Sequence, residues 1–288
     1  MKTIRLIPSL ILLLSVSAGT ASAQQQVKLG ENAALRYWSA FAQMQDFAVT
    51  DQQAKEAHLI LEGSAPYDDA KYKDLVEKYK YALQTMARGT ALPRCDWGVD
   101  YQLGPQAPVD YVRKALPLGL LNVFYAYHLL STGDKDGAVR SLAAGFHFSR
   151  DVANGGTLFA TLSAKNLLVA HLRVGAFAMH KAGLSAEQRL VLQKAFAELG
   201  PDGLDWQSAM KRELEIPHGL DAQGSAAQAR ITTAYLSALN NPSTLPELQQ
   251  MIASAPQPLP DIIPNPKRVL EEKQDLSDKL LHPHSLLQ

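Results

Sequence analysis

The sequence predicts an all-α protein, and three observations lead to that prediction. Apolar residues recur at three- and four-residue steps along most of the chain, which is the spacing of one face of a helix. Four segments match the capping box, in which a Ser or Thr is followed three residues later by Gln or Glu, and they begin at Thr50, Ser185, Ser225 and Thr244. No stretch alternates β-branched or aromatic residues with polar ones for the length of a strand. We therefore expect antiparallel helical hairpins, packed as a solenoid or as an irregular bundle.

Glycine, proline and capping residues set the bounds of the expected helices. These helices cover 31–46, 50–63, 67–88, 109–130, 134–153, 157–182, 185–199, 202–214, 225–239, 244–253 and 267–281. Asp202 is the expected cap of the helix 202–214. Pro117 lacks an N–H group and should either kink its helix or mark the first turn. The helix 157–182 is apolar nearly all round, which predicts the centre of the core.

Residues 1–23 have the three-part layout of a secretory signal peptide. Lys2 and Arg5 precede a short apolar run, and small residues lead to the expected cleavage after Ala23. The run is too short for a stable membrane anchor, and no later segment approaches the roughly 20 apolar residues that a span needs. Gln24 stands where a lipoprotein would have cysteine. We expect an exported, soluble protein of the periplasm or the extracellular space.

The chain beyond the signal peptide divides into three expected segments. Residues 24–254 form the helical domain. The segment 255–266 holds five prolines and shows no periodicity, which predicts an extended linker. Residues 267–288 contain a charged helix with a thin apolar stripe, which indicates a loosely attached C-terminal arm.

Composition and motifs exclude several classes of function. The chain has 28 basic and 28 acidic side chains, and loss of the signal peptide removes two basic ones, so no net charge favours nucleic acid or an anionic membrane. A single cysteine, Cys95, excludes an intrachain disulfide. The sequence lacks a phosphate-binding loop, a dinucleotide fingerprint and a His-Glu-x-x-His zinc motif. We expect no cofactor and no metal.

One constellation resembles a family of exported bacterial helical proteins to which no activity is assigned. The residues that carry the resemblance are Cys95-Asp96-Trp97-Gly98, Asp100-Tyr101, Gly104-Pro105, Ala209-Met210 and Glu213. The resemblance implies an all-α fold and export, and it leaves the function open because the family offers no activity, ligand or catalytic residue to transfer. The hairpin around Gly133-Asp134 is also similar to a single tetratricopeptide repeat. Neighbouring hairpins do not repeat the pattern, so it indicates packed hairpins and not a peptide-binding array.

The loop 92–108 and its surroundings hold most of the candidate site residues. The candidate ligand-binding residues are Asp96, Trp97, Asp100, Tyr101, His147 and Glu213. We expect Cys95 to be a packed structural cysteine, because free cysteine is among the most buried residue types. Asp96, Trp97 and Gly98 predict a turn held by a buried indole, with an aromatic platform for a sugar or peptide as the alternative.

Two functional hypotheses from different classes follow. We favour an exported helical scaffold without catalytic activity, which binds a peptide, a protein or a component of the cell envelope between its hairpins. The alternative is an envelope hydrolase that uses the Cys95–Trp97 loop or carboxylates near Trp206, namely Asp205, Glu213 and Glu215. Convergence of the acids, His147 and Trp97 on a pocket would favour the hydrolase.

Overall fold

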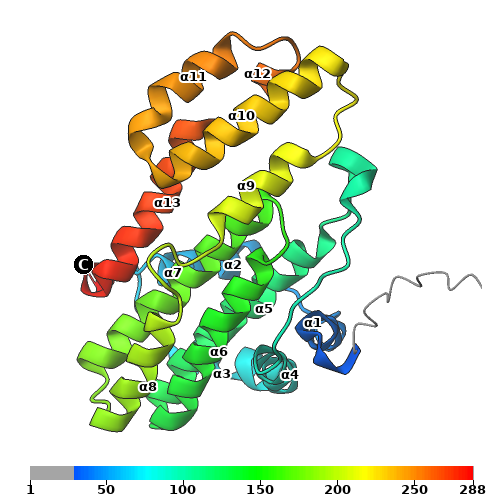
Figure 1. Ribbon diagram of the computed structural model, residues 1–288. Helices are drawn as coiled ribbons and strands as arrows, with labels where there is room; N and C mark the ends of the chain where they lie inside the picture. Colours follow the sequence, from blue (N-terminus) through cyan, green and yellow to red (C-terminus); the bar gives the residue numbers. More distant parts are fainter. Residues whose placement is uncertain (1–28, 288) are drawn as a thin grey trace, which may run out of the picture.

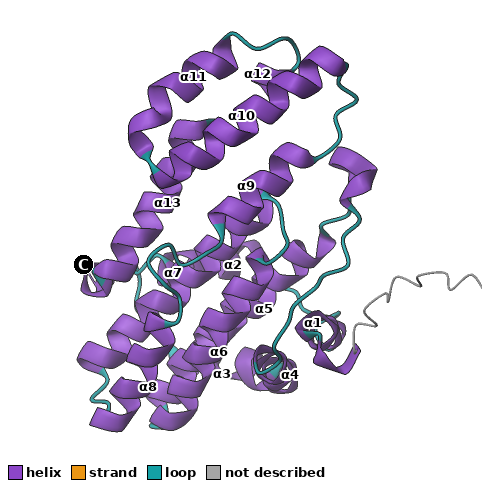
Figure 2. Ribbon diagram, viewed as in Figure 1, coloured by secondary structure: helices purple, strands orange, loops and turns teal. Residues whose placement is uncertain are grey.

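The computed structural model describes residues 29–287, and this part of the chain is all-α, as predicted (Figure 2). The helices are α1 (Ala33–Ala42), α2 (Asp51–Leu61), α3 (Asp69–Lys78), α4 (Lys80–Thr90), α5 (Asp110–Ser131), α6 (Lys135–Ala153), α7 (Leu158–Lys181), α8 (Ala186–Ala197), α9 (Trp206–Glu215), α10 (Ala222–Asn240), α11 (Leu245–Ala253), α12 (Leu259–Ile262) and α13 (Pro266–Leu281). None of these helices is long and apolar enough to cross a membrane. The expected signal peptide lies outside the described residues.

Helices α5, α6 and α7 form the centre of a bundle (Figure 1). α1 and α4 pack together on one side of this centre, and α8 packs against α6. α10, α11 and α12 form a separate group at the top of Figure 1, and α9 and α13 run between this group and the bundle. Leu167, Leu168 and Leu172 of α7 are fully buried, which confirms the prediction that this helix lies at the centre of the core.

Glycine lets α6 approach α7 closely around a buried polar cluster. A Cβ atom on Gly145 would lie 2.1 Å from Cδ2 of His171. His171 is fully buried, with Nδ1 2.8 Å from the carbonyl oxygen of Leu167 and Nε2 3.1 Å from Nδ2 of Asn122. Asn122 also donates to the carbonyl of Ser141 at 2.9 Å. Each of these buried polar groups therefore has a partner, as buried polar groups require.

The prediction of a single helix over 67–88 was wrong, because the chain breaks at Tyr79. Its backbone has φ −106° and ψ 15°, which ends α3 and starts α4. The Tyr79 side chain is buried, its hydroxyl donates to Oδ1 of Asp46 at 3.0 Å, and its ring packs on Phe47. These tertiary contacts change the direction of the chain at Tyr79, although the helical spacing of apolar residues in the sequence continues through this position. α5 runs on both sides of Pro117, so that proline does not mark a first turn.

Two of the four predicted capping boxes are confirmed. The Thr50 hydroxyl accepts from the N–H of Gln53, and the Gln53 side chain accepts from the N–H of Thr50. Ser185 and Gln188 make the same reciprocal pair at the start of α8. Both boxes are local motifs, which is why sequence spacing alone finds them.

Three other predicted caps were wrong. α10 begins earlier than Ser225, because Asp221 accepts from the N–H of Gly224 and caps it. Thr244 makes no side-chain cap for α11. Asp205 caps α9 in place of Asp202, which lies in the preceding turn. The competing caps of α9 and α10 are aspartates, and aspartate is among the best N-cap residues.

The C-terminal segments are packed more tightly than expected. Within 255–266, the short helix α12 buries Leu259 completely, so the segment is not extended throughout. The expectation that the helix after it is a loose arm was wrong. α13 packs on α7, where the nearly buried ammonium of Lys165 pairs with Glu272 and Asp275, each at 2.5 Å. A buried lysine with two carboxylate partners is a specific attachment point.

Candidate functional site

Trp97 anchors the loop between α4 and α5. Its side chain is buried with 9% exposed, and Nε1 donates to the carbonyl oxygen of Asp151 at 2.7 Å. The indole stacks on Tyr111 with ring centroids 4.3 Å apart, and it also packs against Tyr37 and Phe41. The prediction that this indole is buried is confirmed. An exposed platform for a ligand would not have these contacts.

Asp96 and Asp100 form turns in the same loop. Oδ1 of Asp96 accepts from the N–H of Gly98 at 2.9 Å, and Gly98 has φ +66°, a left-handed conformation that glycine adopts without strain. Asn32 brackets Asp96 by accepting from its N–H at 2.9 Å and donating to its carbonyl at 2.8 Å. Oδ1 of Asp100 accepts from the N–H of Gln102 at 3.0 Å. The predicted turn is therefore confirmed, and both acids contribute to the backbone structure.

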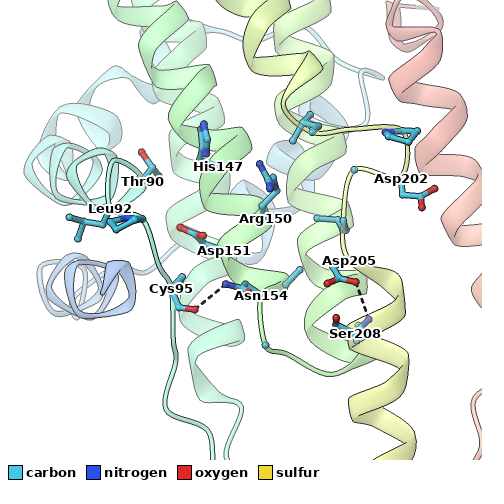
Figure 3. A pocket seen from close by; sticks show the side chains of 18 residues that line it. Thr90, Leu92, Cys95, His147, Arg150, Asp151, Asn154, Asp202, Asp205 and Ser208 are labelled. Atoms are coloured by element: carbon cyan, nitrogen blue, oxygen red, sulfur yellow. Dashed lines mark hydrogen bonds between the residues drawn. The ribbon is translucent and has the colours of Figure 1, made fainter. Parts of the chain in front are cut away.

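A cleft of about 640 Å³ lies beside this loop (Figure 3). The loop residues 92–95, the C-terminal end of α6 and the segment 199–209 form its walls. Its polar side chains include Thr90, His147, Arg150, Asp151, Asn154, Asp202, Asp205 and Ser208. Its volume lies within the range of about 300–1,000 Å³ that small-molecule sites occupy.

Asp151 is the most perturbed acid of the cleft. Its carboxylate accepts a hydrogen bond from the Tyr37 hydroxyl, a contact that joins α6 to α1. Burial raises the pKa of Asp151 to about 6, although the Tyr37 hydrogen bond, His147 and Arg150 each act to lower it. Burial and the nearby carboxylate also raise the pKa of Tyr37. The cleft thus contains a carboxyl whose pKa is raised by burial towards neutral pH.

Cys95 lines the cleft but is not prepared to act as a nucleophile. Its side chain is buried, and burial together with the nearby Asp151 and Asp96 raises the pKa of the thiol well above its usual range. The thiolate is the reactive form of cysteine, and these surroundings disfavour it. The carbonyl of Cys95 accepts from Nδ2 of Asn154 at 3.0 Å, which ties the loop to α6. The prediction of a packed structural cysteine is confirmed.

The cleft carries charges of both signs, with Arg150 and Asp151 on the α6 wall and Asp202 and Asp205 on the other wall. On the α6 wall, Arg150 is exposed and donates to the carbonyl of Glu198 at 3.2 Å, and His147 lies 3.4 Å from the Glu198 carboxylate. On the other wall, Oδ1 of Asp205 accepts from the N–H of Ser208 at 2.9 Å. Asp202 lies on the same wall and pairs with Lys273 of α13 at 2.6 Å. In Figure 3 the Asp202 carboxylate points towards α13, away from Arg150.

The structure does not bring the six predicted site residues together. Of the six, His147 alone lines the main cleft. Asp96 lines a smaller neighbouring pocket of about 260 Å³. Tyr101 lies outside the cleft, with its ring 5.0 Å from the guanidinium of Arg212, and it neighbours Tyr111, on which Trp97 stacks. The main cleft therefore does not unite the six residues.

Glu213 has a structural partner in place of a catalytic one. Its Oε2 accepts from the N–H of Leu158 at 2.9 Å, in the first turn of α7, where Thr157 makes no side-chain cap. The carboxylates proposed for a hydrolase are likewise occupied, since Asp205 caps α9 and Glu215 pairs with Lys211 at 3.8 Å. Among residues 29–287, no three His, Cys, Asp or Glu side chains are placed to hold a metal ion.

Glu213→Ala should therefore lower stability. The variant leaves the N–H of Leu158, in the first turn of a central helix, without this partner, and loss of a cap costs about 1 kcal/mol. Glu213→Gln keeps an acceptor and should lose about half as much, since only the interaction with the helix dipole is removed. Urea denaturation of both variants measures these losses. An unfolding midpoint unchanged by Glu213→Ala would contradict the capping role.

Sequence reasoning missed Arg150, Asp151 and Asn154, which form one wall of the cleft. A signal for Asp151 was present in the sequence, because Asp151 continues the buried face of α6 that includes Ala144 and Phe148. A carboxylate at a helix position of the buried face has to find a partner or change its pKa. Its partners, Tyr37 and Trp97, lie far away in the sequence, and no local pattern identifies them.

Comparison with known proteins finds no relative of this chain. No family model, no curated protein and no solved structure matches the chain. The resemblance carried by the loop 95–98 and the tetratricopeptide-like spacing stay predictions. The fold and the site define an all-α helical protein with a cleft of mixed charge.

Proposed function

We propose that this protein is an exported binding protein without catalytic activity, and that its cleft takes a short peptide with free termini. The observation that carries the proposal is the mixed charge of the cleft. Arg150 and Asp151 lie on one wall, and Asp205 lies on the other together with Asp202, which also pairs with Lys273. A peptide with free termini is itself dipolar. Its carboxylate would lie near Arg150 and its ammonium near the aspartates.

The remaining polar groups of the cleft suit a peptide backbone. Ser208 and His147 offer donors and acceptors at exposed or half-exposed positions. A guanidinium binds a carboxylate through two parallel hydrogen bonds, which fixes the orientation of the ligand as well as its affinity. The exported setting is part of the proposal and rests on the layout of residues 1–23.

Binding is favoured over catalysis by the state of the reactive groups. The buried Cys95 thiol has a raised pKa, Glu213 accepts from the N–H of Leu158, and Glu215 pairs with Lys211. An activated nucleophile needs an adjacent base or a lowered pKa, and Cys95 has neither. A binding site needs only complementary groups.

Titration calorimetry with the tripeptide Ala-Ala-Ala tests the proposal. We expect binding of the unblocked peptide and a loss of roughly tenfold or more in affinity when its termini are acetylated and amidated, since each charge-assisted contact contributes about 1.5–3 kcal/mol. Arg150→Gln should weaken binding of the unblocked peptide. Asp205→Asn should do the same while keeping the α9 cap, because asparagine caps helices as well as aspartate does.

Asp221→Asn is the matched control, since it makes the same change at the cap of α10, outside the cleft. It should leave the affinity unchanged. Absence of binding by the unblocked peptide, or equal binding of the blocked and unblocked peptides, would contradict the proposal.

One observation supports a hydrolase as the second candidate function. Asp151 lies in the cleft with a pKa raised to about 6, close to His147, and general acids and bases have pKa values near the working pH. Mass spectrometry of the peptide after the titration separates the two functions. Cleaved peptide that is absent with Asp151→Asn would establish the hydrolase.

A further inference from the structure

A second cavity, separate from the proposed peptide cleft, lies between α2, α3 and α5. Its volume is about 350 Å³. Leu75 of α3 and Leu116, Leu120 and Phe124 of α5 form its inner wall. The wall is almost entirely hydrocarbon.

Helix α2 covers this cavity and contributes little buried surface of its own. Ile60 is its one buried residue, and Ala57 and Leu61, which face the cavity, are half-buried. The C-terminal end of α2 is fastened, because Arg173 donates to the carbonyl of Leu61. The N-terminal end is held by its own capping box at Thr50. Ala57 and Leu61 therefore line the cavity and also pack on the edge of the core, to which Ile60 belongs.

The polar groups at the cavity already have partners. Gln53, His58 and Tyr72 are the residues of the lining with polar side-chain groups, and the Tyr72 hydroxyl donates to Oε2 of Glu56 at 3.5 Å. The Gln53 side chain accepts from the N–H of Thr50 at 2.9 Å, and His58 pairs with Glu62 at 3.0 Å. An ionised ligand would find no free opposite charge at this lining. Ordered water would lack the two to four polar partners that it needs.

We propose that this cavity binds an uncharged, largely hydrocarbon small molecule, with α2 as its cover. Interiors are close-packed, so an apolar space of this size gains dispersion contacts and buries apolar surface when a hydrocarbon fills it. The volume lies within the range of about 300–1,000 Å³ of known ligand pockets. Neutrality of the ligand follows from the absence of a free charge in the lining.

The test uses N-phenyl-1-naphthylamine, a neutral fluorophore with three aromatic rings whose emission rises in apolar surroundings. We expect saturable binding with one molecule per chain. Ala57→Trp places a large side chain in the cavity and should weaken binding by roughly tenfold or more. Lys55→Trp introduces the same residue at an exposed position of the same helix that does not line the cavity, and it should leave the affinity unchanged.

Leu120→Trp fills the cavity from the opposite wall and provides a second test if Ala57→Trp does not fold. Circular dichroism of each variant reports its helix content. Absence of saturable binding to the wild-type protein, or equal binding by the filled and control variants, would overturn the proposal. A charged analogue that binds as tightly as the neutral probe would overturn the neutrality of the ligand.

Discussion

Trp97→Ala should destabilise the protein by about 3–5 kcal/mol, which is typical of the removal of a large ring from a core. The buried indole stacks on Tyr111 and donates to the carbonyl of Asp151, so the variant loses packing, aromatic contacts and a hydrogen bond together. The loop 92–108 has no strand or long helix of its own to hold it. Urea denaturation measured by circular dichroism gives the free energy of unfolding.

Two variants separate the parts of this effect. Trp97→Phe keeps a ring but loses the N–H donor, and it should cost about 1–2 kcal/mol. Trp38→Ala removes an indole from the same aromatic cluster at a position that is 38% exposed. It should cost less than Trp97→Ala because less apolar surface is lost from the core. An unchanged midpoint for Trp97→Ala would point to a ligand platform in place of an anchor.

Local features of this fold could be predicted from the sequence, and features made by distant contacts could not. The Thr50 and Ser185 caps depend on residues three positions away, and the turn at Asp96 depends on Gly98 two positions away. The break at Tyr79 depends on a contact with Asp46, which no local pattern reveals.

The candidate site depends even more on contacts between residues that are distant in the sequence. His147 was predicted as a site residue and lines the cleft, but Asp151 was not predicted. Asp151 becomes distinctive only when α1 brings Tyr37 to its carboxylate and the loop brings Trp97 to its carbonyl. Glu213 was predicted for its charge near Trp206, and the structure uses that charge to cap another helix.

Asp151 and His171 should make opposite contributions to the change of stability with pH. The folded-state pKa of Asp151 is raised by burial to about 6 from 3.8, so the folded protein holds the proton more tightly than the unfolded chain. This contribution to stability is full below pH 3.8 and is lost as the pH rises through 6. The folded-state pKa of His171 is lowered by burial to about 4 from 6.5. Its contribution is full above pH 6.5 and is lost as the pH falls through 4.

Each contribution amounts to about 3 kcal/mol, since one pKa unit corresponds to about 1.4 kcal/mol. Between pH 4 and pH 6, the stability lost through Asp151 as the pH rises nearly equals the stability gained through His171. Asp151→Asn removes one side of this balance while keeping an acceptor for the Tyr37 hydroxyl. Relative to the wild-type protein, the variant should therefore lose about 3 kcal/mol of stability when the pH is lowered from 7 to 4. Urea denaturation of both proteins across this range measures the difference.

Tyr37→Phe provides the directional control. The Tyr37 hydroxyl stabilises the ionised carboxylate of Asp151 and lowers its pKa, so removal of the hydroxyl should raise that pKa further. Relative to the wild-type protein, the gain in stability on acidification should then begin at a higher pH. A difference between Asp151→Asn and the wild-type protein that stays constant from pH 4 to pH 7 would mean that Asp151 keeps an ordinary pKa. The buried carboxylate would then be solvated or paired by a group other than Tyr37.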